Sequence, residues 1–157
     1  MKRCEVCEKG ALRKKKVENY KYPTPMGIVT VDGTSEFEEC SHCKEVFISG
    51  ETITYWNRLI LGRLVAKKGY LSPQELIFVF SVLPYFQTEL ASATGREKST
   101  LTKYKKGANP IDPLFDHTLR EIISDYLKGR ADTIGSLTAR HQFVFNEDEP
   151  IRKISAS

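Results

Sequence analysis

The stretch SPQELIFVFSVLPYFQTELASATGREKSTLTKYKKG, residues 72–107, decides the fold of the central part of the chain. It opens with Ser-Pro-Gln-Glu at 72–75, in which the serine caps a helix, the proline suits the first helical position and the glutamate returns a hydrogen bond to the cap. Pro84 bounds this first helix, and Gly95 and Gly107 punctuate the remainder of the stretch. The stretch therefore predicts three short helices joined by brief turns.

The second and third of these helices have the layout of a helix-turn-helix. We expect the second over 85–94 and the third over 97–106. In such a pair the first helix lies across the DNA backbone and the second enters the major groove. From Arg96 to Lys106 the chain carries five basic residues against one acidic residue, a local charge of +4 that equals its whole net charge. This favours phosphate binding, and a solvated helix with scattered lysines is the alternative.

Amphipathic segments flank the central stretch on both sides. From about Glu51 to Lys68 the apolar residues recur at helical spacing, which predicts a connecting helix ended by Gly69. Asp112 and Pro113 begin a fourth helix with an apolar stripe. The first helix of the central stretch is apolar on nearly every side, which predicts burial all round it, either in a deeper core or in an interface.

All four cysteines lie in the first 50 residues, as two C-x-x-C motifs separated by 32 residues. Two such turns point four thiolates at one site, the tetrahedral sulfur set that zinc prefers. Between the motifs, 14–22 and 28–37 read as hairpin strands, punctuated by prolines, glycines and the pair Asp32-Gly33. The predicted ligands of one structural Zn²⁺ are Cys4, Cys7, Cys40 and Cys43.

A closed four-cysteine site leaves no position for water or substrate, so its expected role is structural. We expect the module to unfold without metal, because it has few large apolar groups of its own. Two alternatives stay open: a redox C-x-x-C pair, and His42 in place of one cysteine ligand.

Length and composition set the remaining limits. A chain of 157 residues that is 40% hydrophobic has enough material for a folded core. It has no apolar run as long as a membrane span, and residues 1–10 are too polar for a secretory signal, so we expect a cytoplasmic protein with no membrane partner. His42, His117 and His141 lie in unrelated segments and no catalytic motif emerges, so we expect no enzymatic activity.

These observations predict an α+β protein in two modules. A small zinc-stapled β module over 1–50 is joined by a connecting helix over 51–69 to an all-helical helix-turn-helix module over 70–129. A tail occupies 130–157. Its HQFVF run at 141–145 is open between a strand added to a partner and a frayed end.

In their order, the two cysteine motifs, GYLSPQELIFVFSVL at 69–83, FQTELA at 86–91 and STLTKYKKG at 99–107 resemble the MqsA-like antitoxin family. That family combines a YgiT-type zinc finger with an Xre-type, lambda-repressor-like helix-turn-helix. The likeness covers about residues 1–128. Lys105 departs from the family pattern, in which an acidic residue is common at that position.

The resemblance implies an antitoxin that binds a toxin through its zinc domain, dimerises through its helical domain and represses its own operon at a palindromic operator. It implies base-reading positions at Ser99 and Lys103, with Gln87 on the DNA backbone. Together with the charge pattern, it gives a full set of expected contacts to double-stranded DNA. These are Ser99, Thr100 and Lys103 on bases, and Gln87, Arg96, Lys98, Lys105 and Lys106 on the backbone.

Two other functions remain compatible with the sequence. One is a stand-alone transcription regulator without a toxin. The other is a protein-interaction module whose helix-turn-helix does not meet DNA. Salt dependence separates the second from a DNA-binding protein, because phosphate contacts make affinity fall steeply with salt.

Overall fold

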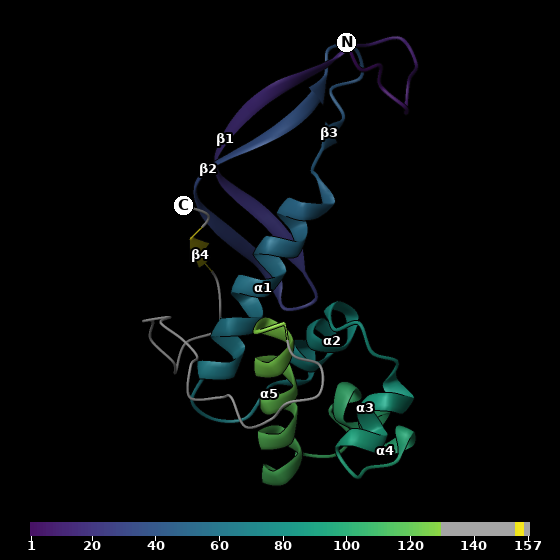
Figure 1. Cartoon of the computed structure of the whole chain (residues 1–157), viewed down its shortest axis with the longest axis vertical. Helices are drawn as coiled ribbons and strands as arrows, with labels where there is room; N and C mark the ends of the chain where they lie inside the picture. The colour runs from purple at the N-terminus through teal and green to yellow at the C-terminus, as the bar shows by residue number, and fades with distance from the viewer. Residues whose placement is uncertain (130–152, 156–157) are drawn as a thin grey trace.

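A computed structural model describes residues 1–129 and 153–155. Within these residues a long β-hairpin rises at one end of the molecule, four helices gather at the other, and a fifth helix runs between them (Figure 1). The predicted α+β class is confirmed. The elements are β1 (Leu12–Thr24), β2 (Gly27–Cys40), β3 (Val46–Phe47), α1 (Gly50–Ala66), α2 (Pro73–Val82), α3 (Gln87–Ala93), α4 (Lys98–Lys106), α5 (Pro113–Leu127) and β4 (Lys153–Ser155).

The sheet is built around β2. β1 and β3 pair with it antiparallel, and β4 pairs with it in parallel through residues 30–32. Neither β3 nor β4 was expected from the sequence, because two- and three-residue strands carry no detectable periodicity. The expected run at 141–145 and the rest of the tail outside β4 lie beyond the described residues.

The hairpin strands are longer at both ends than the predicted 14–22 and 28–37, and the second continues through Asp32-Gly33 as predicted. The pairing register shifts between Glu18 and Tyr20, and at this point Asn19 and Gly33 have positive φ angles of 49° and 90°. The Gly33 N–H donates a hydrogen bond to Asn19 Oδ1 at 3.3 Å. The strands therefore form a β-bulge at Asn19 and Gly33, which increases the local twist and lets both strands continue.

Aromatic packing joins the hairpin to α1. Trp56 of α1 is 1% exposed. Its ring stacks on Tyr20 with centroids 5.4 Å apart and meets Phe37 edge-on at 6.1 Å. Tyr22 lies 5.3 Å from the same ring and donates a hydrogen bond from its hydroxyl to Asn57 Oδ1 at 2.8 Å. The hairpin residues that surround Trp56 therefore belong to the same core as the helices.

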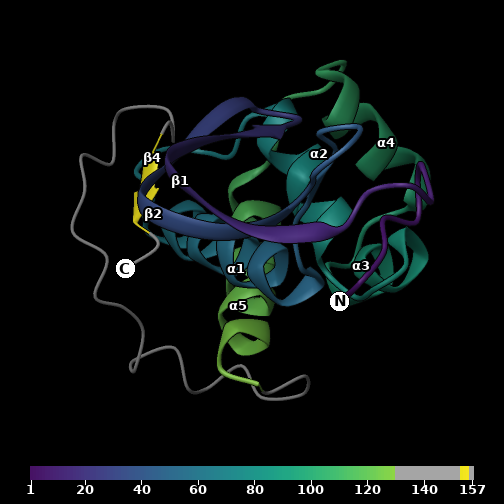
Figure 2. The ribbon, with the colours of Figure 1, turned by 90° about the horizontal axis from the view of Figure 1, so that it is seen from above.

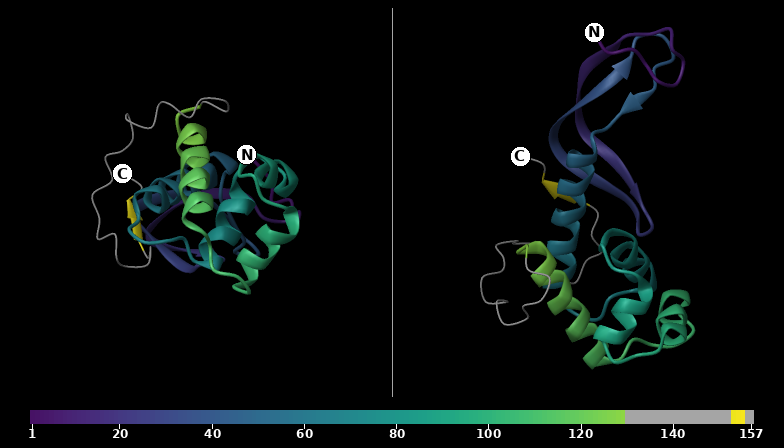
Figure 3. Two further views of the ribbon diagram at one scale, coloured as in Figure 1. Left: turned by 90° about the horizontal axis from the view of Figure 1, so that it is seen from below. Right: turned by 45° about the vertical axis from the view of Figure 1, so that its right-hand side comes forward.

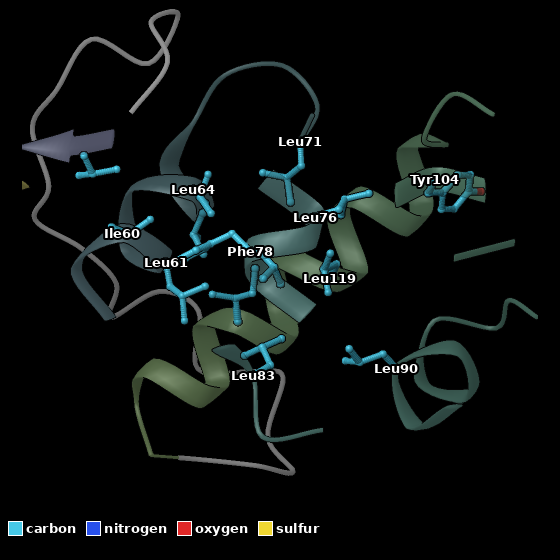
Figure 4. Packing of buried hydrophobic residues seen from close by; sticks show 14 of the residues in the cluster. Ile60, Leu61, Leu64, Leu71, Leu76, Phe78, Leu83, Leu90, Tyr104 and Leu119 are labelled. Carbon is cyan, nitrogen blue, oxygen red and sulfur yellow. The ribbon is translucent and has the colours of Figure 1, made fainter. Parts of the chain in front are cut away.

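The helical part of that core centres on α1. Figure 4 shows Ile60, Leu61 and Leu64 of α1 directed toward Phe78 and Leu83, with Leu119 of α5 nearby. The buried cluster continues without interruption from β2 through α1 to the other helices. It contains Val29, Val31, Phe37, Trp56, Ile60, Leu61, Leu64, Val65, Leu71, Leu76, Phe78, Val79, Leu83, Leu90, Ala91, Leu101, Tyr104, Phe115, Leu119 and Ile123.

The link between α1 and α2 is fixed by Arg120 of α5. Its guanidinium donates hydrogen bonds to the carbonyls of Val65, Lys67 and Gly69, and to the carboxylate of Asp116. Asp116 also accepts a hydrogen bond from the N–H of Leu71 at 3.0 Å. Because Arg120 binds these carbonyls, α1 ends at Ala66, two residues before the predicted end.

α2 begins as predicted but is buried on one side only. Ser72 Oγ accepts a hydrogen bond from the Glu75 N–H and Glu75 Oε1 accepts one from the Ser72 N–H, which confirms the capping box. Ile77 is 39% exposed and Ser81 is exposed, whereas Leu76 is fully buried. The deeper-core alternative was wrong, because the neighbouring elements cover a single face of this helix, whereas the interface alternative stays a prediction.

α3 and α4 lie on the opposite side of the molecule from β4 (Figure 2). Both begin within two residues of the predicted helix starts. Among the described residues, no helix by itself has the length and apolarity of a membrane span. Only α2 and α3 taken together reach these values, and a bend of 110° separates the two helices.

The contact of Trp56 with the hairpin predicts a large cost of truncation. Replacing Trp56 by alanine should lower the free energy of unfolding by about 3–5 kcal/mol, because the cavity would lie between sheet and helix. Tyr55, its 43% exposed neighbour, is the matched control, and Tyr55→Ala should change it by no more than about 0.5 kcal/mol. Urea denaturation measures the free energy of unfolding of both variants. Similar losses for the two would contradict the role of Trp56 as the main contact between the hairpin and α1.

Candidate metal centre and nucleic-acid interface

The four cysteines converge at the far end of the hairpin, which stands clear of the helices (Figure 3). Their Sγ atoms all lie within 4.8 Å of one another. Cys4 Sγ is 3.7 Å from Cys43 Sγ, and Cys7 Sγ is 3.6 Å from Cys40 Sγ. Each motif therefore meets the other, as a shared ion requires, and the set is positioned to hold one metal ion.

The two C-x-x-C motifs fold into the same turn. The residue after the second cysteine, Glu8 or Lys44, has a positive φ of 56° or 63°. Its N–H donates a hydrogen bond to the carbonyl of the first cysteine, at 2.9 Å for Cys4 and 3.2 Å for Cys40. The local turn therefore aims both thiols of a motif to one side.

Gly10 lets the two turns approach each other. A Cβ at this position would lie 2.3 Å from Cys40 Sγ and 2.9 Å from the backbone nitrogen of His42. Its carbonyl accepts a hydrogen bond from the Cys4 N–H at 2.9 Å. Only glycine fits between the motifs, a requirement that spacing analysis of the cysteines did not reveal.

The protein environment shifts the thiol pKa values in opposite directions. Backbone hydrogen bonds from Gly10 and Lys9 lower the pKa of Cys7 to about 6. A backbone hydrogen bond from Glu45 lowers the pKa of Cys43, but burial and the neighbouring thiols outweigh it and raise that pKa to about 12. One thiol ionises readily while another resists, because four thiolates at this separation repel one another unless a cation lies between them.

The predicted recognition pair consists of α3 and α4 joined by a tight turn. Gly95, with φ of 66°, lets the chain reverse, and the Arg96 N–H closes the turn on the Ala91 carbonyl at 2.9 Å. Gln87 at the start of α3 donates hydrogen bonds to the Lys98 carbonyl at 3.2 Å and to Thr102 Oγ1 at 3.0 Å. Its side chain thus ties the two helices together.

α4 presents a polar face to solvent. Leu101 and Tyr104 point into the core, whereas most of the predicted contact residues on α4 are exposed. Thr100 and Lys105 are half-buried at its flanks, and Lys105 Nζ lies 5.7 Å from the ring centroid of Phe80 on α2. The exposed predicted residues on α4 are Lys98, Ser99, Lys103 and Lys106.

Arg96 does not share this face. Its guanidinium forms a two-point ion pair with Asp112, with Nε 3.0 Å from Oδ2 and Nη2 2.8 Å from Oδ1. Arg96 and the other groups bonded to this carboxylate hold the pKa of Asp112 well below its usual range. Sequence reasoning gave Asp112 only a capping role, because its pairing with a residue 16 positions earlier depends on tertiary structure.

The close approach at Gly10 predicts that Gly10→Ala weakens metal binding. We expect about a 10- to 100-fold loss of affinity, as for removal of groups that orient metal ligands, because Cys40 must move to make room. Gly50, where an added Cβ meets nothing within 4 Å, provides the control Gly50→Ala. Competition against a chromophoric chelator measures both variants, and unchanged affinity in Gly10→Ala would refute the packing argument.

Chelation of the metal should unfold only the cysteine end of the hairpin. Val29 and Val31 are buried in the main core, so this half of β2 has support that does not depend on metal. Hydrogen exchange after chelation should therefore become fast for residues 4–11 and stay slow at Val29 and Val31. Loss of protection at both ends would restore the sequence-based expectation that the whole module unfolds.

No known protein family and no curated protein matches the chain. The likeness to MqsA-like antitoxins thus rests on the motifs in the sequence.

Proposed function

We propose that this protein is a zinc-stabilised DNA-binding transcription regulator whose recognition helix is α4. The observation that carries the proposal is the division of α4 into two faces. Leu101 and Tyr104 anchor it in the core, and Lys98, Ser99, Lys103 and Lys106 are exposed together on the outside. A surface helix with a basic, hydrogen-bonding outer face after a tight turn is the element that enters a major groove.

Zinc is the metal that we propose for the cysteine cluster. A tetrahedral ion with Zn–S bonds of about 2.3 Å separates its sulfurs by about 3.8 Å. The Cys4–Cys43 and Cys7–Cys40 Sγ separations, 3.7 and 3.6 Å, lie close to this value. With four cysteines as ligands the ion has no open position, so its proposed role is to staple residues 1–11 to the end of the hairpin.

Base reading is proposed for Ser99 and Lys103, with Thr100 beside them. Ser99 and Lys103 are four residues apart, so their side chains lie on the same side of α4 one turn apart. Lys98 and Lys106 at the two ends of the helix are proposed to contact phosphates. Gln87 donates its amide protons to α4, so its side chain supports the helix pair. Gln87 is also the proposed contact of α3 with the DNA backbone.

A homodimer and an antitoxin role derive from the resemblance alone. Two subunits would place their α4 helices in successive major grooves about 34 Å apart. The cognate toxin would bind the zinc module. Co-purification with the product of a neighbouring gene tests the antitoxin role separately from DNA binding.

The first test is binding of the zinc-loaded protein to the DNA upstream of its own coding sequence and to random DNA, by fluorescence anisotropy across a range of salt. Tight, salt-sensitive preference for the upstream DNA is the expected result. Absence of binding to either DNA would overturn the proposal and favour a protein-interaction module.

Two lysines of α4 should respond differently to truncation. Lys103→Ala should weaken binding to the preferred DNA by about 1–3 kcal/mol and relax sequence preference, because a base contact is lost. Lys106→Ala should weaken binding to all DNA equally and lower the salt slope by about 1, because a phosphate contact is lost. Equal losses from both variants on both kinds of DNA would remove the assignment of α4.

A further inference from the structure

One carboxylate accepts four hydrogen bonds from groups at the two ends of α4 and at the start of α5. Asp112 accepts from Arg96 Nε at 3.0 Å and Arg96 Nη2 at 2.8 Å. It also accepts from the Tyr104 hydroxyl at 2.6 Å and from the Phe115 N–H at 2.8 Å. Both carboxylate oxygens are engaged, and three different segments supply the donors.

The donors come from both ends of α4. Arg96 directly precedes Glu97, the N-cap residue of α4, and Tyr104 lies in the last turn of the helix. Phe115 lies in the first turn of α5, and its ring packs on Tyr104 with centroids 4.8 Å apart. Asp112 therefore ties the start and the end of α4 to the start of α5.

We propose that Asp112 is a positioning residue for DNA recognition, and that Arg96 serves to hold Asp112 instead of contacting a DNA phosphate. This inference rests on the proposed function of α4. It reassigns Arg96, which the charge pattern had grouped with the phosphate ligands.

The packing of α4 explains why it needs such a constraint. The helix has nine residues, and only Leu101 and Tyr104 are buried. Gln87 adds hydrogen bonds to Lys98 and Thr102, and Asp112 adds the restraint that reaches Tyr104 in the last turn. Base reading requires the helix axis to be held, because a small roll moves Ser99 and Lys103 away from their hydrogen-bond partners. The planar, two-point pairing of Arg96 with Asp112 supplies direction that a single contact lacks.

The charge of Asp112 gives the inference a distinctive sign. By charge alone, removing an acidic group beside the DNA-binding helix strengthens binding to phosphates. If Asp112 positions α4, its removal weakens binding to the preferred sequence. The two effects therefore point in opposite directions for the same variant.

The experiment compares Asp112→Asn, Arg96→Ala and Arg96→Lys in the zinc-loaded full chain. The probes are a duplex that the wild-type protein selects from a random pool and a scrambled duplex of the same composition. Affinity for each is measured by anisotropy at several salt concentrations. Arg96→Lys keeps the charge and loses the two-point geometry, so it separates positioning from phosphate contact.

All three variants should lose about 10-fold in affinity for the selected duplex, which is comparable with the displacement of one base contact. The affinity of Asp112→Asn for the scrambled duplex should equal or exceed that of the wild type. For Arg96→Ala, the salt slope of binding to the scrambled duplex should stay unchanged. If Arg96→Lys binds like the wild type and Arg96→Ala lowers the salt slope by about 1 on both duplexes, Arg96 is a phosphate ligand and the inference fails.

A second Arg–Asp pair provides the stability control. Asp116 pairs with Arg120 on α5 at 2.8 Å and supports the α1–α2 link, away from the exposed face of α4. Asp116→Asn should lower stability and keep the preference for the selected duplex. Loss of preference in this variant to the same degree as in Asp112→Asn would show a general effect of destabilisation and overturn the inference.

The wild-type protein separates this inference from the function on which it rests. If it selects no duplex and binds neither probe, the proposed function fails and the inference falls with it. If it binds and discriminates while the three variants match it, only the role of Asp112 and Arg96 is overturned.

Discussion

The packing of Trp56 between the hairpin and the helices is the contact on which the rest of the molecule depends. Tyr20, Tyr22 and Phe37 surround its ring on the sheet side, and α1 carries it into the helical core. Without this contact, a hairpin with one face in solvent has little apolar area to bury. Trp56 thereby packs the β module against the helical module, and both contribute to one buried cluster.

Different forces hold the two ends of that unit. Near the cysteines the backbone turns supply direction, but the side chains that converge are cysteines, whose ionised thiolates repel one another unless a cation lies between them. Near α1 the stabilisation comes from buried apolar surface, which needs no ligand. Metal binding is therefore expected to keep the cysteine end of the hairpin folded, and metal loss to leave α4 and the helices packed against it in place.

Local signals in the sequence were sufficient for much of this structure. The cysteine spacing, the capping box at Ser72 and the glycine turn at Gly95 each depend on residues a few positions apart, and each is found as predicted. The bulge at Gly33 and the burial of a single face of α2 depend on which segment lies opposite. The close approach at Gly10 likewise exists only when two distant turns meet.

The role of a charge likewise depends on its partner in space. Residues 96–106 have a local charge of +4 in the sequence, but Asp112 neutralises Arg96, which leaves +3. Of the four lysines, Lys105 leans over Phe80, so three stand on the open face of α4 within the described part of the chain. Because Lys103 is proposed to read bases, one α4 helix offers only Lys98 and Lys106 to phosphates, which is fewer contacts than strongly salt-dependent binding requires. The dimer proposed from the resemblance would double the number of these phosphate contacts.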